Sequence, residues 1–252
     1  MKKLFRQELK SYTPEWNAKC SIITDLIIMI SCFSIGITLI YFSKRYSMIE
    51  IKYSSCLDNN PANEKNKIIC KIPFTIDKII KGPIFIYYKL ENFYINHRNL
   101  VESKSWKELR GGEGNTKEKC KNSFLMSEMF PSNSPYYINE WNYTFKENDI
   151  SSPCGLWARS FFNDTYNLSF SNGTYINIIE YNISNQYLKK NFFKRRKDYK
   201  TKQWIDVENE HFINWMNIET SHNFKKIWGK IDSDLKPGNY TLIVTNNYDI
   251  IF

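Results

Sequence analysis

The run SIITDLIIMISCFSIGITLIYF, Ser21 to Phe42, decides the fold class of this 252-residue chain. It contains a single charged residue, Asp25, about one turn inside its N-terminal end. A helix rises about 1.5 Å per residue, so roughly 20 apolar residues cross the hydrocarbon core of a bilayer. The run therefore predicts one transmembrane helix, in which Asp25 is close enough to the interface to reach water or to pair with Lys19.

A signal peptide is the competing interpretation of this run. Its apolar core would be shorter, about 7 to 15 residues, with small residues at a cleavage site. The run shows neither feature, and five basic residues precede it while three follow it closely, which favours a cytosolic N-terminus. We expect a cytosolic tail over residues 1–20, a transmembrane helix over 21–42 and an exoplasmic or lumenal domain over 43–252.

The sequence after the apolar run has the pattern of antiparallel strands. Aromatic residues make up 16% of the chain and hydrophobic residues 42%, which favours a folded domain over disorder. In the last strand-like run, Tyr240, Leu242 and Val244 share one face. The strand-like runs are MIEIKY (48–53), KIICKIPFTI (67–76), PIFIYYKL (83–90), TYNLSFS (165–171), TYINIIEYNI (174–183) and NYTLIVTNNYDIIF (239–252).

One segment has helical periodicity instead. From Glu210 to Ile231, six apolar residues recur at helical spacings, which predicts a single helix with an apolar stripe against the core. No helices of crossover length alternate with the strands. The sequence thus predicts a membrane-anchored α+β protein. Its exoplasmic domain would be β-rich, antiparallel and sandwich-like, with one or two helices.

Six acceptor sequons for N-glycosylation follow the apolar run. Four of them fall between Asn163 and Asn182, which suits a glycan-bearing exoplasmic surface. We expect some of the six to be occupied. The acceptor residues are Asn142, Asn163, Asn167, Asn172, Asn182 and Asn239.

The six cysteines divide into two groups. Cys20 and Cys32 lie at or in the membrane run and are expected to be free. The other four form an even set, which in a lumenal compartment indicates two disulfides with three possible connectivities. Zinc is a weaker alternative because no C-x-x-C spacing occurs. The four are Cys56, Cys70, Cys120 and Cys154.

The formal net charge is +9, and much of it lies in LKKNFFKRRKDYKTK, Leu188 to Lys202. Such a run can be a solvated loop, or it can bind an anionic membrane surface or an acidic partner. Nucleic acid is not expected as the partner of a domain beyond a membrane anchor.

The stretch NFYINHR follows a strand-like run and gathers polar side chains around aromatic ones. Donors at the end of a strand can satisfy backbone carbonyls, while aromatic rings supply packing area. We interpret the stretch as a hydrogen-bonded framework, with direct partner contact and catalysis as alternatives. The residues are Asn92, Phe93, Tyr94, Asn96, His97 and Arg98.

Signals for catalysis or cofactors are weak. The three histidines, His97, His211 and His222, have no His or Cys neighbour at metal-ligand spacing, so no metal or cofactor is expected. Phosphate loops, nucleophile elbows and dinucleotide fingerprints do not occur in the sequence. The motif Asp232-Ser233-Asp234 allows a lumenal glycosyltransferase as a minor alternative, although an α/β nucleotide-binding core cannot be seen in the pattern.

Seven segments in the same order resemble the cell division control protein 50 family, also called the ligand-effect modulator family. They cover nearly the whole chain, which makes the resemblance specific. The segments are FRQELKSYTP (5–14), MIEIKYSSC (48–56), CKIPFTID (70–77), GPIFIYYKLENFYINHRNLVESKSWKELRG (82–111), PCGLWARSFFNDTY (153–166), FINWMNIETSHNFKKIWGKI (212–231) and GNYTLIVTNNYDIIF (238–252).

The resemblance implies a non-catalytic β-subunit of a type IV P-type ATPase, a phospholipid flippase. Such a subunit accompanies the ATPase out of the endoplasmic reticulum, reaches the Golgi or plasma membrane, and supports lipid translocation. The family pattern also supports the pairs Cys56–Cys70 and Cys120–Cys154. A single-pass adhesion or receptor glycoprotein is the leading alternative. The family continues beyond the position of Phe252 into a second membrane helix, so we expect a fragment, a truncated gene product or a short form.

Overall fold

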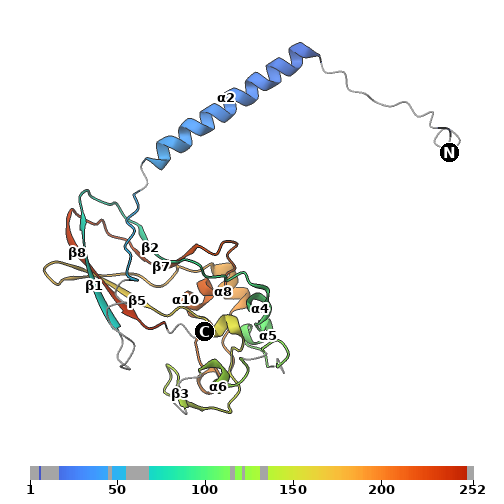
Figure 1. Ribbon diagram of the computed structural model, residues 1–252, viewed down its shortest axis with the longest axis vertical. Coiled ribbons are helices and arrows are strands. Elements are labelled where there is room, and N and C mark those ends of the chain that lie inside the picture. The colour runs from blue at the N-terminus through green and yellow to red at the C-terminus, as the bar shows by residue number, and fades with distance from the viewer. Residues whose placement is uncertain are drawn as a thin grey trace. The chain divides into compact units, whose positions relative to one another are not determined.

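The computed structural model describes residues 6, 17–44, 47–54, 68–113, 117–120, 123–130 and 136–248 (Figure 1). The chain forms two units, Met1–Ile51 and Lys52–Phe252. The first contains helix α2, and the second contains eight strands and seven short helices among its described residues.

Helix α2, Ala18–Ser43, encloses the predicted transmembrane run and is long and apolar enough to cross a membrane. Its 26 residues give a length of about 39 Å. The side chain of Asn17 caps its first turn by accepting from the Lys19 N–H. The hydroxyls of Thr24, Ser31, Ser34 and Thr38 each donate to a carbonyl oxygen three or four residues earlier, at 2.8 Å. These four hydroxyls are therefore satisfied within the helix, as a lipid environment requires.

The largest sheet of the second unit is antiparallel and has the strand order β1-β8-β5-β6. Strand β8 (Gly238–Asn246) lies between β1 (Ile68–Ile76) and β5 (Thr165–Phe170), while the short β6 (Tyr175–Ile176) extends β5 at the edge. Figure 1 shows β1, β8 and β5 side by side. The prediction of antiparallel strands is confirmed for four of the six runs, whereas the run at 48–53 forms no strand and the run at 174–183 contributes only the two residues of β6.

Alternation along β8 positions this sheet over the core. Tyr240 and Val244 are buried and Leu242 is partly buried, so the three lie against the core as the period of two predicts. Val244 is paired with Cys70 of β1 on one side and with Tyr166 of β5 on the other. The first and last described strands of this unit are thus neighbours.

The predicted helix over Glu210–Ile231 is wrong beyond its first turns. Helix α10 spans only Glu210–Trp215, and strand β7 occupies Phe224–Ile231 and pairs antiparallel with β2, Ile84–Leu90. Phe224, Lys226 and Trp228 are buried along β7, whereas the residues between them are exposed or partly buried. The connection contains Thr220, Ser221 and Asn223, which favour turns over helix interiors.

The expectation of one or two helices in this unit is also wrong, because seven occur among its described residues. Six of them have four to six residues and α8 (Gln186–Phe192) has seven, so each has at most about two turns, too few to produce a visible hydrophobic period. Local caps fix several of them, such as the Asn185 side chain at α8 and the Asn209 side chain at α10. The remaining elements are α4 (Arg98–Glu102), α5 (Trp106–Leu109), α6 (Met126–Met129), β3 (Tyr136–Ile138), β4 (Thr144–Lys146), α7 (Leu156–Arg159), α8 (Gln186–Phe192) and α9 (Tyr199–Lys202).

Two fully buried tryptophans join α7 to α10 at the centre of the core. The indole N–H of Trp157 donates to the carbonyl of Trp215 at 3.2 Å, and that of Trp215 donates to the carbonyl of Trp157 at 2.9 Å. The ammonium group of Lys104 lies 3.7 Å from the centre of a Trp157 ring. Each buried indole donor therefore has a partner, which burial requires.

Candidate functional site

The stretch from Asn92 to Arg98 forms a loop that begins with a backbone reversal. Asn92 has φ of 57°, a left-handed conformation that Asn tolerates better than most residues. Its N–H donates to the side-chain oxygen of Asn223 at 2.9 Å, and the N–H of Phe93 donates to the carbonyl of His222 at 3.0 Å. The loop is thus held to the connection that precedes β7.

Two apolar side chains anchor the loop to the core. Ile95 is fully buried, and Phe93 meets Trp215 and Phe224 edge to face, with ring centroids 5.5 and 6.1 Å apart. The side-chain amide of Asn96 adds a donation to the carbonyl of Thr220 at 2.9 Å. The hydrogen-bonded framework is therefore built from backbone groups and from the side chains of Asn96 and Asn223.

The other polar residues of the loop face solvent. Tyr94 is 61% exposed and stacks on His222, with ring centroids 5.5 Å apart. His97 precedes α4 without a side-chain capping bond. The Arg98 side chain is 83% exposed and pairs with Glu102 at 2.9 Å, one turn along α4. All three side chains are exposed. A surface ion pair such as that of Arg98 contributes little to stability, so the three side chains are available for contact.

The structure contains a disulfide between Cys120 and Cys154, whose Cα atoms are 5.6 Å apart. Both cysteines are buried, and the N–H of Cys154 donates to the Glu108 carboxylate at 2.9 Å. Cys70 is disulfide-bonded too, whereas Cys56 lies outside the described residues, so that pair stays a prediction. Cys20 and Cys32 are free and exposed on α2.

The asparagines of all six sequons are exposed. Those at Asn142 and Asn182 have positive φ, 63° and 56°, and lie in turns. An exposed asparagine at each acceptor position leaves room for a glycan outside the core.

The side chains considered for metal or nucleotide chemistry serve other contacts. His211 pairs with Glu180 at 2.9 Å, and Asp234 accepts from the N–H of Gly82 at 2.8 Å. Asp232 lies 3.3 Å from the ammonium group of Lys230. Across the described ranges, no three His, Cys, Asp or Glu side chains are grouped to hold a metal ion.

A buried carboxylate that the sequence analysis missed joins three distant parts of the chain. Asp164 is 3% exposed and accepts from the N–H groups of Asn247 and Tyr248 at 2.8 and 2.9 Å. The Tyr53 hydroxyl donates to it at 3.2 Å and lies 2.9 Å from the Tyr166 hydroxyl. Burial raises the pKa of Asp164, while the two backbone donors act in the opposite direction.

Glu210, at the start of α10, is a second buried carboxylate that was missed. It accepts from the N–H groups of Ile183 and Ser184 at 2.7 and 2.8 Å, and from the ammonium of Lys189 at 2.8 Å. Burial acts to raise the pKa of Glu210, but Lys189 and the backbone donors outweigh it and lower that pKa to about 2. An acidic residue directly after an Asn that can cap a helix was the only sequence signal.

The chain matches the LEM3 (ligand-effect modulator 3) family / CDC50 family over residues 39–251. ALA-interacting subunit 3 of Arabidopsis thaliana is 29% identical to it, with 97% of this chain and 70% of that protein covered. Cell cycle control protein 50A is 28% identical in Bos taurus and 29% in Mus musculus, in each case covering 97% of this chain and 74% of that protein. The matched range contains the Asn92–Arg98 loop, the disulfide and both buried carboxylates, and the chain belongs to the LEM3/CDC50 family.

Proposed function

We propose that the chain is the non-catalytic accessory subunit of a type IV P-type ATPase that translocates phospholipid. The observation that carries this proposal is the family match over residues 39–251, with relatives named as interacting subunits. The ATPase supplies the ATP site and the lipid path. This chain supports folding of the complex, its export from the endoplasmic reticulum and its translocation cycle.

The proposed topology has a cytosolic tail over residues 1–20, a spanning helix over 21–42 and a sandwich-like exoplasmic or lumenal domain over 43–252. The exposed asparagines of the six sequons and the Cys120–Cys154 disulfide support a lumenal environment for this domain. The complex would reside in the endoplasmic reticulum, the Golgi or the plasma membrane. We propose glycosylation at the six sequons and a second disulfide between Cys56 and Cys70.

Within this domain, we assign two roles to the Asn92–Arg98 loop. Asn92, Phe93 and Asn96 hold its shape through the contacts described above. Tyr94, His97 and Arg98 are exposed and contact the partner. Aromatic and arginine side chains are enriched among the residues that dominate binding energy at protein interfaces, which supports this assignment.

The test co-expresses the tagged chain with a P-type ATPase and identifies the proteins that co-purify by mass spectrometry. Tyr94→Ala should lower recovery of the ATPase without changing export of the chain. Tyr175→Ala is the matched control, because Tyr175 is 68% exposed on edge strand β6. If no P-type ATPase co-purifies with the unmodified chain, the proposed function fails. Equal recovery with both variants would reject only the contact role of Tyr94.

A further inference from the structure

The segment Leu188–Lys202 contains eight Lys or Arg residues and one Asp. It is not a loose basic loop, because it forms α8, a short connection and α9. The Phe193 side chain is 2% exposed and fixes the connection to the core. The N–H of Lys194 also donates to the Leu109 carbonyl at 2.8 Å, and that of Arg195 to the Glu208 carboxylate at 3.0 Å.

Three cations of this segment are engaged within the chain. Arg195 binds Asp206 through two guanidinium nitrogens. Arg196 binds Asp198 and reaches Glu113 at 2.9 Å. Lys189 is paired with Glu210. These pairs hold the segment in place and show that its cations already bind carboxylates.

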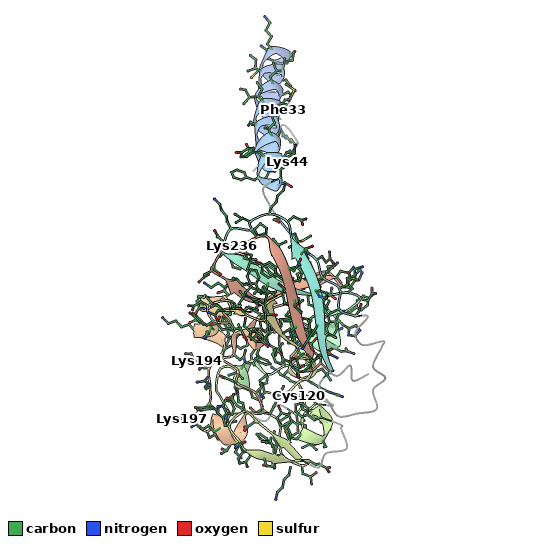
Figure 2. The ribbon with its side chains drawn as sticks, turned by 90° about the vertical axis from the view of Figure 1, so that its left-hand side faces the viewer. Phe33, Lys44, Cys120, Lys194, Lys197 and Lys236 are labelled. Carbon is green, nitrogen blue, oxygen red and sulfur yellow. A yellow bond between two sulfur atoms is a disulfide. The ribbon has the colours of Figure 1, made fainter. Side chains whose placement is uncertain are left out.

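Six other cations on and beside the segment are exposed: Lys200 and Lys202 on α9, and four around α8 and the connection. The guanidinium of Arg110 lies 4.7 Å from the centre of the Phe192 ring, which places it next to α8. Arg110, Lys190, Lys194 and Lys197 are exposed, and none has an ion pair in the described part of the chain. Figure 2 shows Lys194 and Lys197 along the same side of the molecule. We call these four residues the basic face.

A shallow hollow of about 430 Å³ lies within this surface. Lys190 and Lys194 line it together with Phe193 and the paired Lys189, Arg195 and Glu208. The hollow is therefore lined mainly by cationic side chains, two of which, Lys190 and Lys194, have no ion pair among the described residues. A site that is already folded loses less conformational entropy on binding than a loop that must first become ordered.

We propose that the basic face docks an acidic segment of a protein, a run of Asp and Glu carboxylates. Lysines carry compact charges on separate flexible stems, which suits carboxylates at irregular spacing. An anionic membrane is the weaker occupant, because the negative surface potential belongs to the cytosolic leaflet and the proposed topology puts this domain on the other side. The choice of occupant rests on that topology and on no particular ATPase.

The test measures binding of a fluorescein-labelled peptide of alternating Glu and Gly to the purified full-length chain, by fluorescence anisotropy at increasing salt. Binding should weaken with salt, since exposed charges are screened. The quadruple variant with Gln at Arg110, Lys190, Lys194 and Lys197 should bind about tenfold more weakly. A control with Gln at the exposed Lys71, Lys78, Lys81 and Lys146 has the same net charge and should bind like the unmodified chain.

Equal weakening in the two quadruple variants would overturn the proposal, because net charge alone would then explain binding. Stronger binding to phosphatidylserine vesicles than to the peptide, lost in the first variant, would assign the face to lipid and also overturn it. Thermal unfolding checks that both variants are folded. Recovery of a co-expressed ATPase in both variants would leave the proposed function intact even where the acidic peptide fails to bind.

Discussion

Two buried carboxylates, Glu210 and Asp164, hold the second unit together in different ways. Glu210 has a cation, Lys189, and its pKa is lowered to about 2. Asp164 accepts from backbone N–H groups and from Tyr53, has no ion pair in the described part of the chain, and its pKa is raised by burial. The two carboxylates have opposite pKa shifts because only one has a counter-ion close enough to offset its loss of hydration.

Because only Glu210 has a counter-ion, the two carboxylates contribute differently to stability at neutral pH. Ionised Glu210 stabilises the fold through an ion pair and two backbone donors. Asp164 has no cation to offset the cost of its burial, yet it accepts from two partly buried N–H groups just beyond the end of β8. We expect replacement of Asp164 to be more damaging, because it removes the shared acceptor of three partly buried donors.

The largest expected effect is therefore that of Asp164→Ala. It leaves the N–H groups of Asn247 and Tyr248 and the hydroxyl of Tyr53 without their acceptor. Each buried unsatisfied group costs about 1 to 3 kcal/mol, so we expect a loss of about 3 to 5 kcal/mol in the free energy of unfolding. Urea unfolding of the purified chain measures it.

Two further variants interpret that result. Asp164→Asn keeps a carbonyl acceptor, so it should lose less stability than the alanine variant, and both variants keep the sequon at Asn163. Asp232→Ala removes an exposed carboxylate paired with Lys230 and should be nearly neutral. A full loss with Asp164→Asn would mean that the charge, and not the acceptor geometry, is what matters.

Glu210→Gln should have the next largest effect, and it should depend on pH. The folded-state pKa of about 2 lies below the ordinary value of 4.5, so the stabilisation is complete above pH 4.5 and disappears as the pH falls through about 2. The shift corresponds to about 3 kcal/mol at neutral pH. Thermal unfolding of the unmodified chain and of Glu210→Gln, measured from neutral pH down to about pH 2, should show a stability difference that becomes smaller in acid.

The same titration of Asp164→Asn should give the opposite trend. The folded-state pKa of Asp164 lies above 3.8, so protonation in acid favours the folded state and the unmodified chain should gain stability relative to the variant. If both differences shrink in acid, the contrast between the two carboxylates is wrong.

The sequence predicted the parts of the fold that have long, unambiguous periods. The apolar run predicted α2, and the alternation of Tyr240, Leu242 and Val244 predicted β8 and its buried face. It failed over Glu210–Ile231, where Ile227, Trp228 and Ile231 fit both a helical and a strand pattern. Pairing with β2, a contact between residues far apart in the chain, decides between the two patterns, and periodicity cannot show that contact.

The candidate site was harder to predict because its chemistry depends on burial. The sequence drew attention to the polar residues of the Asn92–Arg98 loop, of which Arg98 proves to be exposed. Nothing in the sequence singled out Asp164, because this residue is simply the middle position of the sequon at Asn163. Its donors come from Tyr53 and from Asn247 and Tyr248, and only the folded chain brings them together.

Within the loop, Asn92→Ala should cost about 1 kcal/mol of stability, because alanine is strained at a φ of 57°. Asn92→Gly is the matched control and should be close to neutral, since glycine adopts this conformation freely. Urea unfolding of the two variants measures the difference. Equal losses would show that the Asn92 side chain, and not its backbone conformation, holds the loop.

The smallest effect on stability is expected for Arg98→Ala, and it separates the two roles of the loop. The sequence placed Arg98 in a hydrogen-bonded framework, but an 83% exposed side chain with one surface ion pair predicts a change within about 0.5 kcal/mol. If Arg98 contacts the ATPase, the variant should be exported normally and recover less ATPase on co-purification. Glu102→Ala removes the same ion pair while keeping Arg98, so it should leave recovery unchanged. A loss of export with Arg98→Ala but not with Glu102→Ala would show that Arg98 belongs to the framework after all, and the division of the loop into a holding part and a contact part would fail.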